Sequence, residues 1–206
     1  KQLMNCANNK DIFRIIQSIP SKRAEPFKQW LSQLGRERIE EIENPELAQN
    51  RAKEYYELKG YPKKWIDKRL RGIAIRQELT EEWQKRGVEE RRDFAILTNE
   101  ISEATFGIGI KQHKLFKNIP KQSKSNLRDH MNDLELIFTM LGEKATTEIT
   151  QTHRSEEFHQ LKQDSRKGGS IARNARLELE KETGRKVISK ENYIDITKRK
   201  KKKKLE

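Results

Sequence analysis

Apolar residues recur along this chain at spacings of three and four, which is the pattern of helices that bury one face. The clearest case is residues 126–143, where five of them form one continuous stripe: Leu127, Met131, Leu134, Phe138 and Leu141. Three further apolar residues widen the stripe: Leu136, Ile137 and Met140. We therefore expect this segment to be the central core helix, capped by Asn126 and ended by Gly142.

The same periodicity predicts further helices, over residues 11–19, 22–34, 45–59, 61–86, 94–106, 110–116 and 171–183. Pro20 and four glycines are expected to end helices: Gly35, Gly60, Gly87 and Gly184. The 61–86 helix has two apolar faces that do not align, so we expect a bend or break at Gly72 or near Thr80. Gly168-Gly169 is expected to break the chain before the last helix. Because period-two alternation is almost absent, the predicted fold is a mainly α, multi-helix orthogonal bundle around one apolar helix.

Composition agrees with a folded helical protein that has little core to spare. Charged residues make up 37% of the 206 residues and hydrophobic residues 33%. No apolar run approaches the ~20 residues of a membrane span. The single Cys6 excludes an internal disulfide framework and favours a reducing, cytoplasmic location. We expect the natural protein to begin before Lys1, and Leu205-Glu206 has the character of a cloning remnant.

The net charge of +13 is concentrated near one end of the chain. Residues 166–206 contain fifteen Lys/Arg and six Asp/Glu, a net charge of +9. Composition and predicted breaks divide the chain into residues 1–43, a helical core domain at 44–164, a helical extension at 165–197 and a basic tail at 198–206. Self-repulsion of its lysines predicts that the tail is disordered.

Several motifs, in order, resemble a known family. They are FRIIQSIPSKRAEPFKQWL, RIEEIENPELAQNRAKEYYELKGYPKKWIDKRLRGIAIRQELTEEWQKRG, AILTNEISEATFGI, NLRDHMNDLELIFTMLGE and TTEI. Over residues 5–195 the chain resembles bacterial BRO-N-domain proteins of the phage antirepressor type and the DNA-damage-inducible protein D family. The resemblance implies that residues 1–43 are the last helices of a truncated BRO-N-like domain. It also implies a DNA-associated regulator, carried by prophages or induced by DNA damage, without a catalytic motif.

Three basic segments are candidates for DNA contact, because cations along a helix can lie against phosphates and release counterions. The first contains Lys63, Lys64, Lys68, Arg69, Arg71 and Arg76. The second, residues 98–116, has the form of a helix-turn-helix, with Lys111 and Lys114 on the second helix. The third surrounds Gly168-Gly169, with Arg166 and Lys167 just before the glycines and Arg173 and Arg176 after them. For each segment the alternative is an ordinary solvated helix face or hinge, and for the lysine tail it is a solubilising role.

Two other functions remain open from the residues alone. A protein-binding adaptor that acts on a repressor or recombination protein would use an exposed aromatic patch, for example Tyr55, Tyr56 and Trp65. A metal-dependent nuclease would use Asp129, His130 and Asp133, although helix-start charges explain the two aspartates equally well. The sequence otherwise contains no zinc-ligand spacing and no phosphate-cradling glycine motif, so we expect no cofactor, no metal and no catalytic residue.

Overall fold

The computed structural model describes residues 7–193, and within them the predicted mainly α fold is confirmed, with no strand. The basic tail and Leu205-Glu206 lie outside the described residues. The chain divides into two compact units, residues 1–54 and 55–206. The first holds α1 (Asn9–Ser18), α2 (Glu25–Glu43) and most of α3 (Pro45–Leu58). The second holds α4 (Lys63–Lys85), α5 (Arg91–Phe106), α6 (Ile110–Phe116), the 3₁₀ turn η1 (Leu127–His130), α7 (Asp133–His153) and α8 (Phe158–Thr183).

The first unit buries little apolar surface. Helix α1 has no buried residue, and the only buried residue of α2 is Glu41, which pairs with Arg51 at 2.8 Å. The expected helix end at Gly35 is wrong, because α2 continues through it to Glu43. A Cβ at Gly35 would meet nothing within 4 Å, so this glycine only weakens an exposed helix and does not end it. The predicted start at Asn44-Pro45 is confirmed, with the Asn44 side chain accepting a hydrogen bond from the Glu46 amide.

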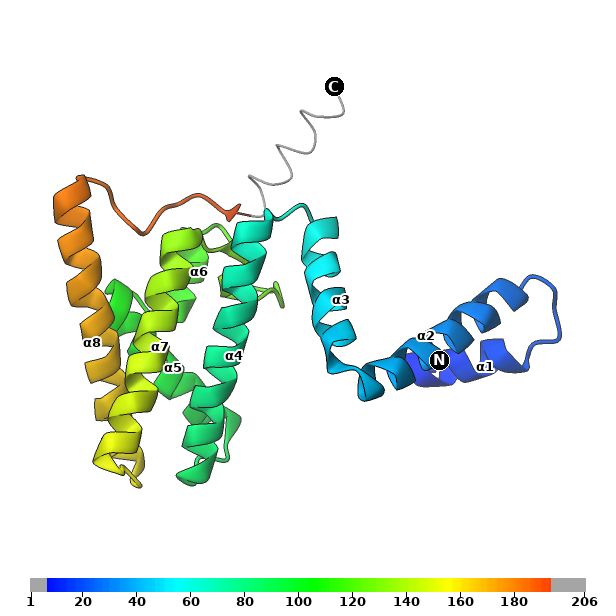
Figure 1. Cartoon of the computed structure of the whole chain (residues 1–206), viewed down its shortest axis with the longest axis horizontal. Coiled ribbons are helices and arrows are strands. Elements are labelled where there is room, and N and C mark those ends of the chain that lie inside the picture. Colours follow the sequence, from blue (N-terminus) through cyan, green and yellow to red (C-terminus); the bar gives the residue numbers. More distant parts are fainter. Residues whose placement is uncertain (1–6, 194–206) are drawn as a thin grey trace, which may run out of the picture. The chain divides into compact units, whose positions relative to one another are not determined.

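In the second unit, α7 lies beside α4 and α8 and also packs against α5, as Figure 1 shows for the first two. Its central position is therefore confirmed, but its predicted limits are wrong. Asn126 caps η1, and the chain then extends through Met131 before Asn132 starts α7 with a capping box. Gly142 lies inside α7, where a Cβ would come within 2.9 Å of Thr105 Oγ1 on α5. This glycine serves helix packing rather than helix termination.

The buried face of α7 also differs from the expected apolar stripe. Phe138 is buried, but Leu134 and Leu141 are 41% and 38% exposed. The buried positions include two carboxylates and a run of hydroxyl groups: Glu135, Glu143, Thr139, Thr146, Thr147 and Thr150. Most of these threonine hydroxyls donate a hydrogen bond to the backbone carbonyl one turn earlier in the helix, as Thr146 does to the Gly142 carbonyl at 2.7 Å. The carboxylates have cationic partners from other segments.

Two predicted interruptions are absent. Helix α4 is continuous, and its two apolar faces serve two different clusters, one around Trp65 and Ile66 and one around Leu79 and Trp83. Helix α8 is continuous through Gly168-Gly169, so the expected break and the domain boundary at 164/165 are wrong. These glycines allow close contact, since a Cβ at Gly168 would lie 2.2 Å from Thr146 Oγ1 on α7. The ends at Gly60, Gly87 and Gly184 are confirmed, each with a positive φ.

Candidate functional site

The cations predicted on α4 divide into exposed and buried groups. Lys63, Lys64 and Arg71 are exposed, and half-buried Lys68 pairs with Asp133. Arg69, in contrast, is 5% exposed, and its Nε donates to Asp129 Oδ1 at 2.8 Å. We correct the prediction for Arg69, which holds α4 to η1 and is not available to an external phosphate.

Arg76 is likewise not a surface group. It donates to Thr98 on α5, lies 3.6 Å from Glu143 on α7, and sits 5.1 Å from the Trp83 ring. Burial lowers the pKa of Arg76 to about 10, although the Glu143 carboxylate acts in the opposite direction. The prediction of phosphate contact is therefore corrected for Arg76, a structural cation between three helices.

The predicted group on α8 divides in the same way. Arg166, Lys167 and Arg173 are exposed, and Arg166 pairs with Glu100 on α5 at 2.5 Å. Arg176 is buried; it donates to the Thr105 carbonyl at 3.0 Å and pairs with Glu180 at 2.8 Å. Since Gly168-Gly169 lie in the interior of α8, their amides are not the free donors of a helix start, which corrects the expected phosphate site there.

The segment predicted as a helix-turn-helix does contain two helices, α5 and α6, joined by a turn in which Gly107 has a φ of +76°. His113 is fully buried, edge-on to Phe106 with ring centroids 5.3 Å apart. Lys111 is exposed, whereas Lys114 is half-buried and donates to the Ser125 carbonyl at 3.2 Å. DNA reading by this pair of helices stays a prediction.

The side chains considered for a nuclease each have a separate structural partner. Asp129 accepts from Arg69, Asp133 pairs with Lys68, and the His130 ring lies between Asn192 and Ser125 at 2.8 and 3.0 Å. Within residues 7–193, no group of three or more His, Cys, Asp or Glu side chains is arranged to hold a metal ion.

The aromatic patch suggested for an adaptor does not form as expected. Tyr55 is 55% exposed, but Trp65 is 1% exposed and its indole N–H donates to the Met131 carbonyl at 3.0 Å. Trp65 also stacks on Tyr61, with ring centroids 4.1 Å apart. We therefore correct the assignment of Trp65, which is a core residue of the second unit.

A basic segment that the sequence analysis recognised only in part lies on α6 and the loop after it. Residues 104–128 contain six Lys/Arg and no Asp or Glu, a signal that a local count of acidic residues would have found. Lys117 and Arg128 form ion pairs with Glu135 and Glu143. In contrast, Lys111, Lys121 and Lys124 are exposed on α6 and the loop after it. We call Lys111, Lys121 and Lys124 the α6 lysine group.

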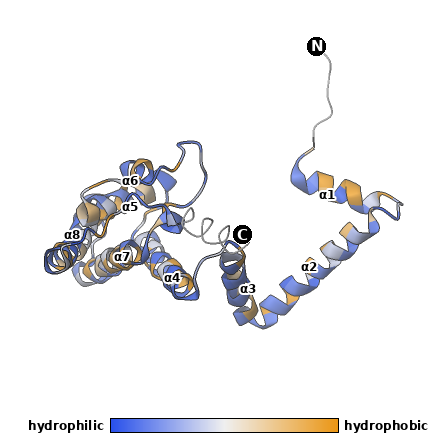
Figure 2. Cartoon of the chain, turned by 90° about the horizontal axis from the view of Figure 1, so that it is seen from above, coloured by the Kyte–Doolittle hydropathy of each residue, from blue (hydrophilic) through white to orange (hydrophobic). Residues whose placement is uncertain are grey.

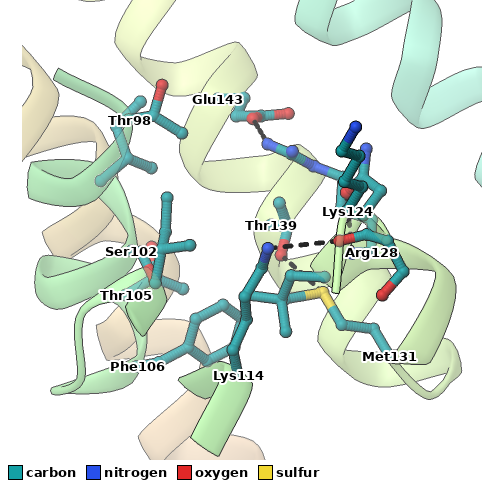
Figure 3. A pocket seen from close by; sticks show the side chains of 15 residues that line it. Thr98, Ser102, Thr105, Phe106, Lys114, Lys124, Arg128, Met131, Thr139 and Glu143 are labelled. Atoms are coloured by element: carbon teal, nitrogen blue, oxygen red, sulfur yellow. Dashed lines mark hydrogen bonds and ion pairs between the residues drawn. The ribbon is translucent and has the colours of Figure 1, made fainter. Parts of the chain in front are cut away.

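Next to this group is a cavity of about 330 Å³, lined by α5, α6, the loop after α6, η1 and α7 (Figure 3). Its apolar lining is Ile101, Phe106, Ile110, Leu127 and Met131. Its hydroxyl lining is Thr98, Ser102, Thr105, Ser125 and Thr139. Lys114 and Lys124 also line it.

A charged pair completes the lining of this cavity, since Arg128 of η1 is bonded to Glu143 of α7. Three buried atoms of the lining side chains have no hydrogen-bond partner among residues 7–193: Glu143 Oε2, Arg128 Nε and Thr105 Oγ1. Unsatisfied buried polar atoms are uncommon in folded proteins, and they are candidates for contact with a ligand.

Comparison with known protein families, curated proteins and solved structures finds no match to this chain. None of the described helices combines the length and the apolar character needed to cross a membrane.

Proposed function

We propose that the chain is a non-catalytic regulatory protein that binds DNA through the exposed lysines and arginines of its second unit. The observation that carries this proposal is the acid-free segment 104–128, which leaves the α6 lysine group without a neighbouring acidic residue in the chain. Lys63, Lys64 and Arg71 of α4, and Lys167 and Arg173 of α8, are further exposed cations. The resemblance to phage antirepressors and the DNA-damage-inducible protein D family supports the same function.

The physical argument is the separation of cations into two classes. Arg69 and Arg176 are buried and Arg76 is half-buried, each against an acidic side chain, and moving them to a phosphate would leave those carboxylates uncompensated. The α6 lysine group is not needed to neutralise a buried carboxylate, so its ammonium groups can approach phosphates and release counterions. Affinity for duplex DNA should therefore depend on this group and fall steeply with salt.

The test is salt-titrated binding of a labelled DNA duplex by the chain ending at residue 197, which removes the lysine run. Reversing two charges, Lys111→Glu and Lys121→Glu, should lower the slope of log affinity against log salt by about two, since each phosphate contact contributes about 0.9. Lys85→Glu with Lys181→Glu is the matched control, because both residues are exposed on other helices. Equal losses in the two double variants would mean that only net charge matters and would refute a binding surface at α6.

A protein-binding adaptor is the second candidate, and one observation favours it. The first unit exposes large apolar side chains on two helices, including Ile12, Phe13, Ile15 and Trp30, at 42, 42, 53 and 49%. Figure 2 shows the apolar face of α1. Pull-down after nuclease treatment should recover a repressor or recombination protein if this face is its binding site, and Phe13→Glu should abolish the recovery. Recovery of nucleic acid alone would contradict the adaptor.

A further inference from the structure

The cavity beside the α6 lysine group combines three chemical features that one class of ligand shares. Phe106, Ile110 and Met131 offer apolar contact to a flat ring. Glu143 and Arg128 carry a free acceptor atom and a free donor atom, Oε2 and Nε, in side chains that are bonded to each other. Lys124, which also lines the cavity, is exposed and cationic.

We propose that this cavity binds a nucleobase, with the attached phosphate held by Lys124. Every nucleobase has an acceptor next to an N–H donor on its pairing edge, and these complement the guanidinium N–H and the carboxylate oxygen. Its ring faces are apolar and can lie against the aliphatic and aromatic lining. A volume of about 330 Å³ falls at the lower end of small-molecule sites, as a single base requires.

The energetic reason lies in the two unpaired atoms. Glu143 has a side chain 2% exposed, and its Oε2 accepts no hydrogen bond from the protein groups of residues 7–193. An unmade hydrogen bond at a buried charged group is costly, so a ligand that supplies the missing donor regains that free energy on binding. Apolar molecules of the same size lack this donor and should bind more weakly.

The base can come from a free mononucleotide or from a nucleotide in a single strand, and in the second case the site deepens the DNA-binding function proposed above. A duplex keeps its pairing edges occupied, so its phosphates can compete for Lys124 but its bases cannot compete for the base contacts in the cavity. Duplex binding by the α6 lysine group and base binding in the cavity can therefore succeed or fail separately.

The experiment measures binding of AMP, GMP, CMP and UMP to the full chain by isothermal titration calorimetry, with ribose 5-phosphate and inorganic phosphate as probes that lack a base. At least one mononucleotide should bind about tenfold or more tightly than ribose 5-phosphate. Displacement of the matching nucleoside, which has no phosphate for Lys124, by a single-stranded oligonucleotide but not by a duplex would identify the strand as the source. Displacement by neither would identify the free nucleotide. If ribose 5-phosphate binds as tightly as every mononucleotide, the base site is refuted.

Two variants locate the site. Ile110→Trp fills the cavity without changing charge and should weaken mononucleotide binding about tenfold or more, while Leu115→Trp on the exposed side of the same helix should have no effect. Thermal unfolding checks that Ile110→Trp remains folded. Lys124→Met, at an exposed residue, should weaken binding of the nucleotide but not of the matching nucleoside. Unchanged affinities in folded Ile110→Trp, or in Lys124→Met, would overturn the assignment, whatever the outcome for duplex DNA.

Discussion

Gly168 offers a direct test of how α8 packs against α7. Replacing a helical glycine by alanine normally stabilises the helix by about 1 kcal/mol, because alanine loses less backbone entropy on folding. At Gly168, however, the new Cβ would lie 2.6 Å from the backbone nitrogen and 2.8 Å from the Cα of Thr146. Backbone atoms of α7 cannot move aside locally, so the two helices must separate. Overpacking of this kind costs about 1–3 kcal/mol, and we expect Gly168→Ala to be destabilising overall.

The matched control is Gly72→Ala in α4, which has the same gain in helix propensity but meets only the flexible Met140 side chain, at 3.4 and 3.5 Å. Gly72→Ala should therefore be neutral or stabilising, so that the two variants differ by about 1–3 kcal/mol in free energy of unfolding. Thermal unfolding followed by circular dichroism measures the difference, at about 2–4 °C in Tm for each kcal/mol in a chain of this size. A Gly168→Ala protein as stable as Gly72→Ala would refute the close packing of α7 and α8.

Further expectations concern the buried polar groups of α7. Lys117→Met leaves the Glu135 carboxylate without the Nζ that lies 2.6 Å away, and it should destabilise the protein by about 3–5 kcal/mol in chemical unfolding. Burial raises the pKa of Glu135, but the His113 ring, whose Nε2 lies 3.5 Å from Oε1, and the charge of Lys117 outweigh it, so the folded-state pKa lies below its usual value. The group thus contributes stability above the unfolded pKa, and unfolding measured between pH 7 and pH 3 should show that contribution lost as the pH falls. Asn132→Ala removes the side-chain acceptor of the Glu135 amide, at 2.9 Å, and should cost about 1 kcal/mol in the same assay.

Glycines explain both the accuracy and the errors of the sequence-based fold. At Gly60, Gly87 and Gly184 the chain needs a positive φ at an exposed helix end, which is the role that periodicity assigned to them. At Gly142, Gly168 and Gly169 the same residue type permits helices to approach, with neighbours on α5 and α7 inside 3 Å of a built Cβ. The sequence does not distinguish these two roles, because the second depends on a segment far away in the chain.

The core of α7 was hard to predict for a related reason. Apolar periodicity gives weight to Leu134 and Leu141, but the buried residues of α7 include Thr146, Thr150 and Glu143. Thr146 can be buried because it donates to the Gly142 carbonyl one turn earlier, and Glu143 because it pairs with Arg128 of η1 and with Arg76 of α4. Apolar periodicity does not show that these polar groups find such partners.

The candidate site was predictable to the extent that charge alone determines it. Lys64 and Arg71 lie on the surface as their helix face predicts, and a count of acidic residues would have added Lys121 and Lys124. Arg69 was indistinguishable from them in sequence, since its partner Asp129 is sixty residues away. The cavity was not predictable, because it depends on how five separate segments meet.

This difference between paired and free cations decides how mutational data on the protein can be interpreted. Removal of Arg69 leaves the partly buried Asp129 carboxylate without its cationic partner and disturbs the packing of η1 on α4. A loss of DNA binding in such a variant can therefore result from unfolding alone. Lys121 makes no comparable demand on the fold, because it is exposed in the loop after α6. A loss of binding in Lys121→Glu at unchanged Tm therefore reports on the DNA contact itself, and the same loss in an Arg69 variant does not.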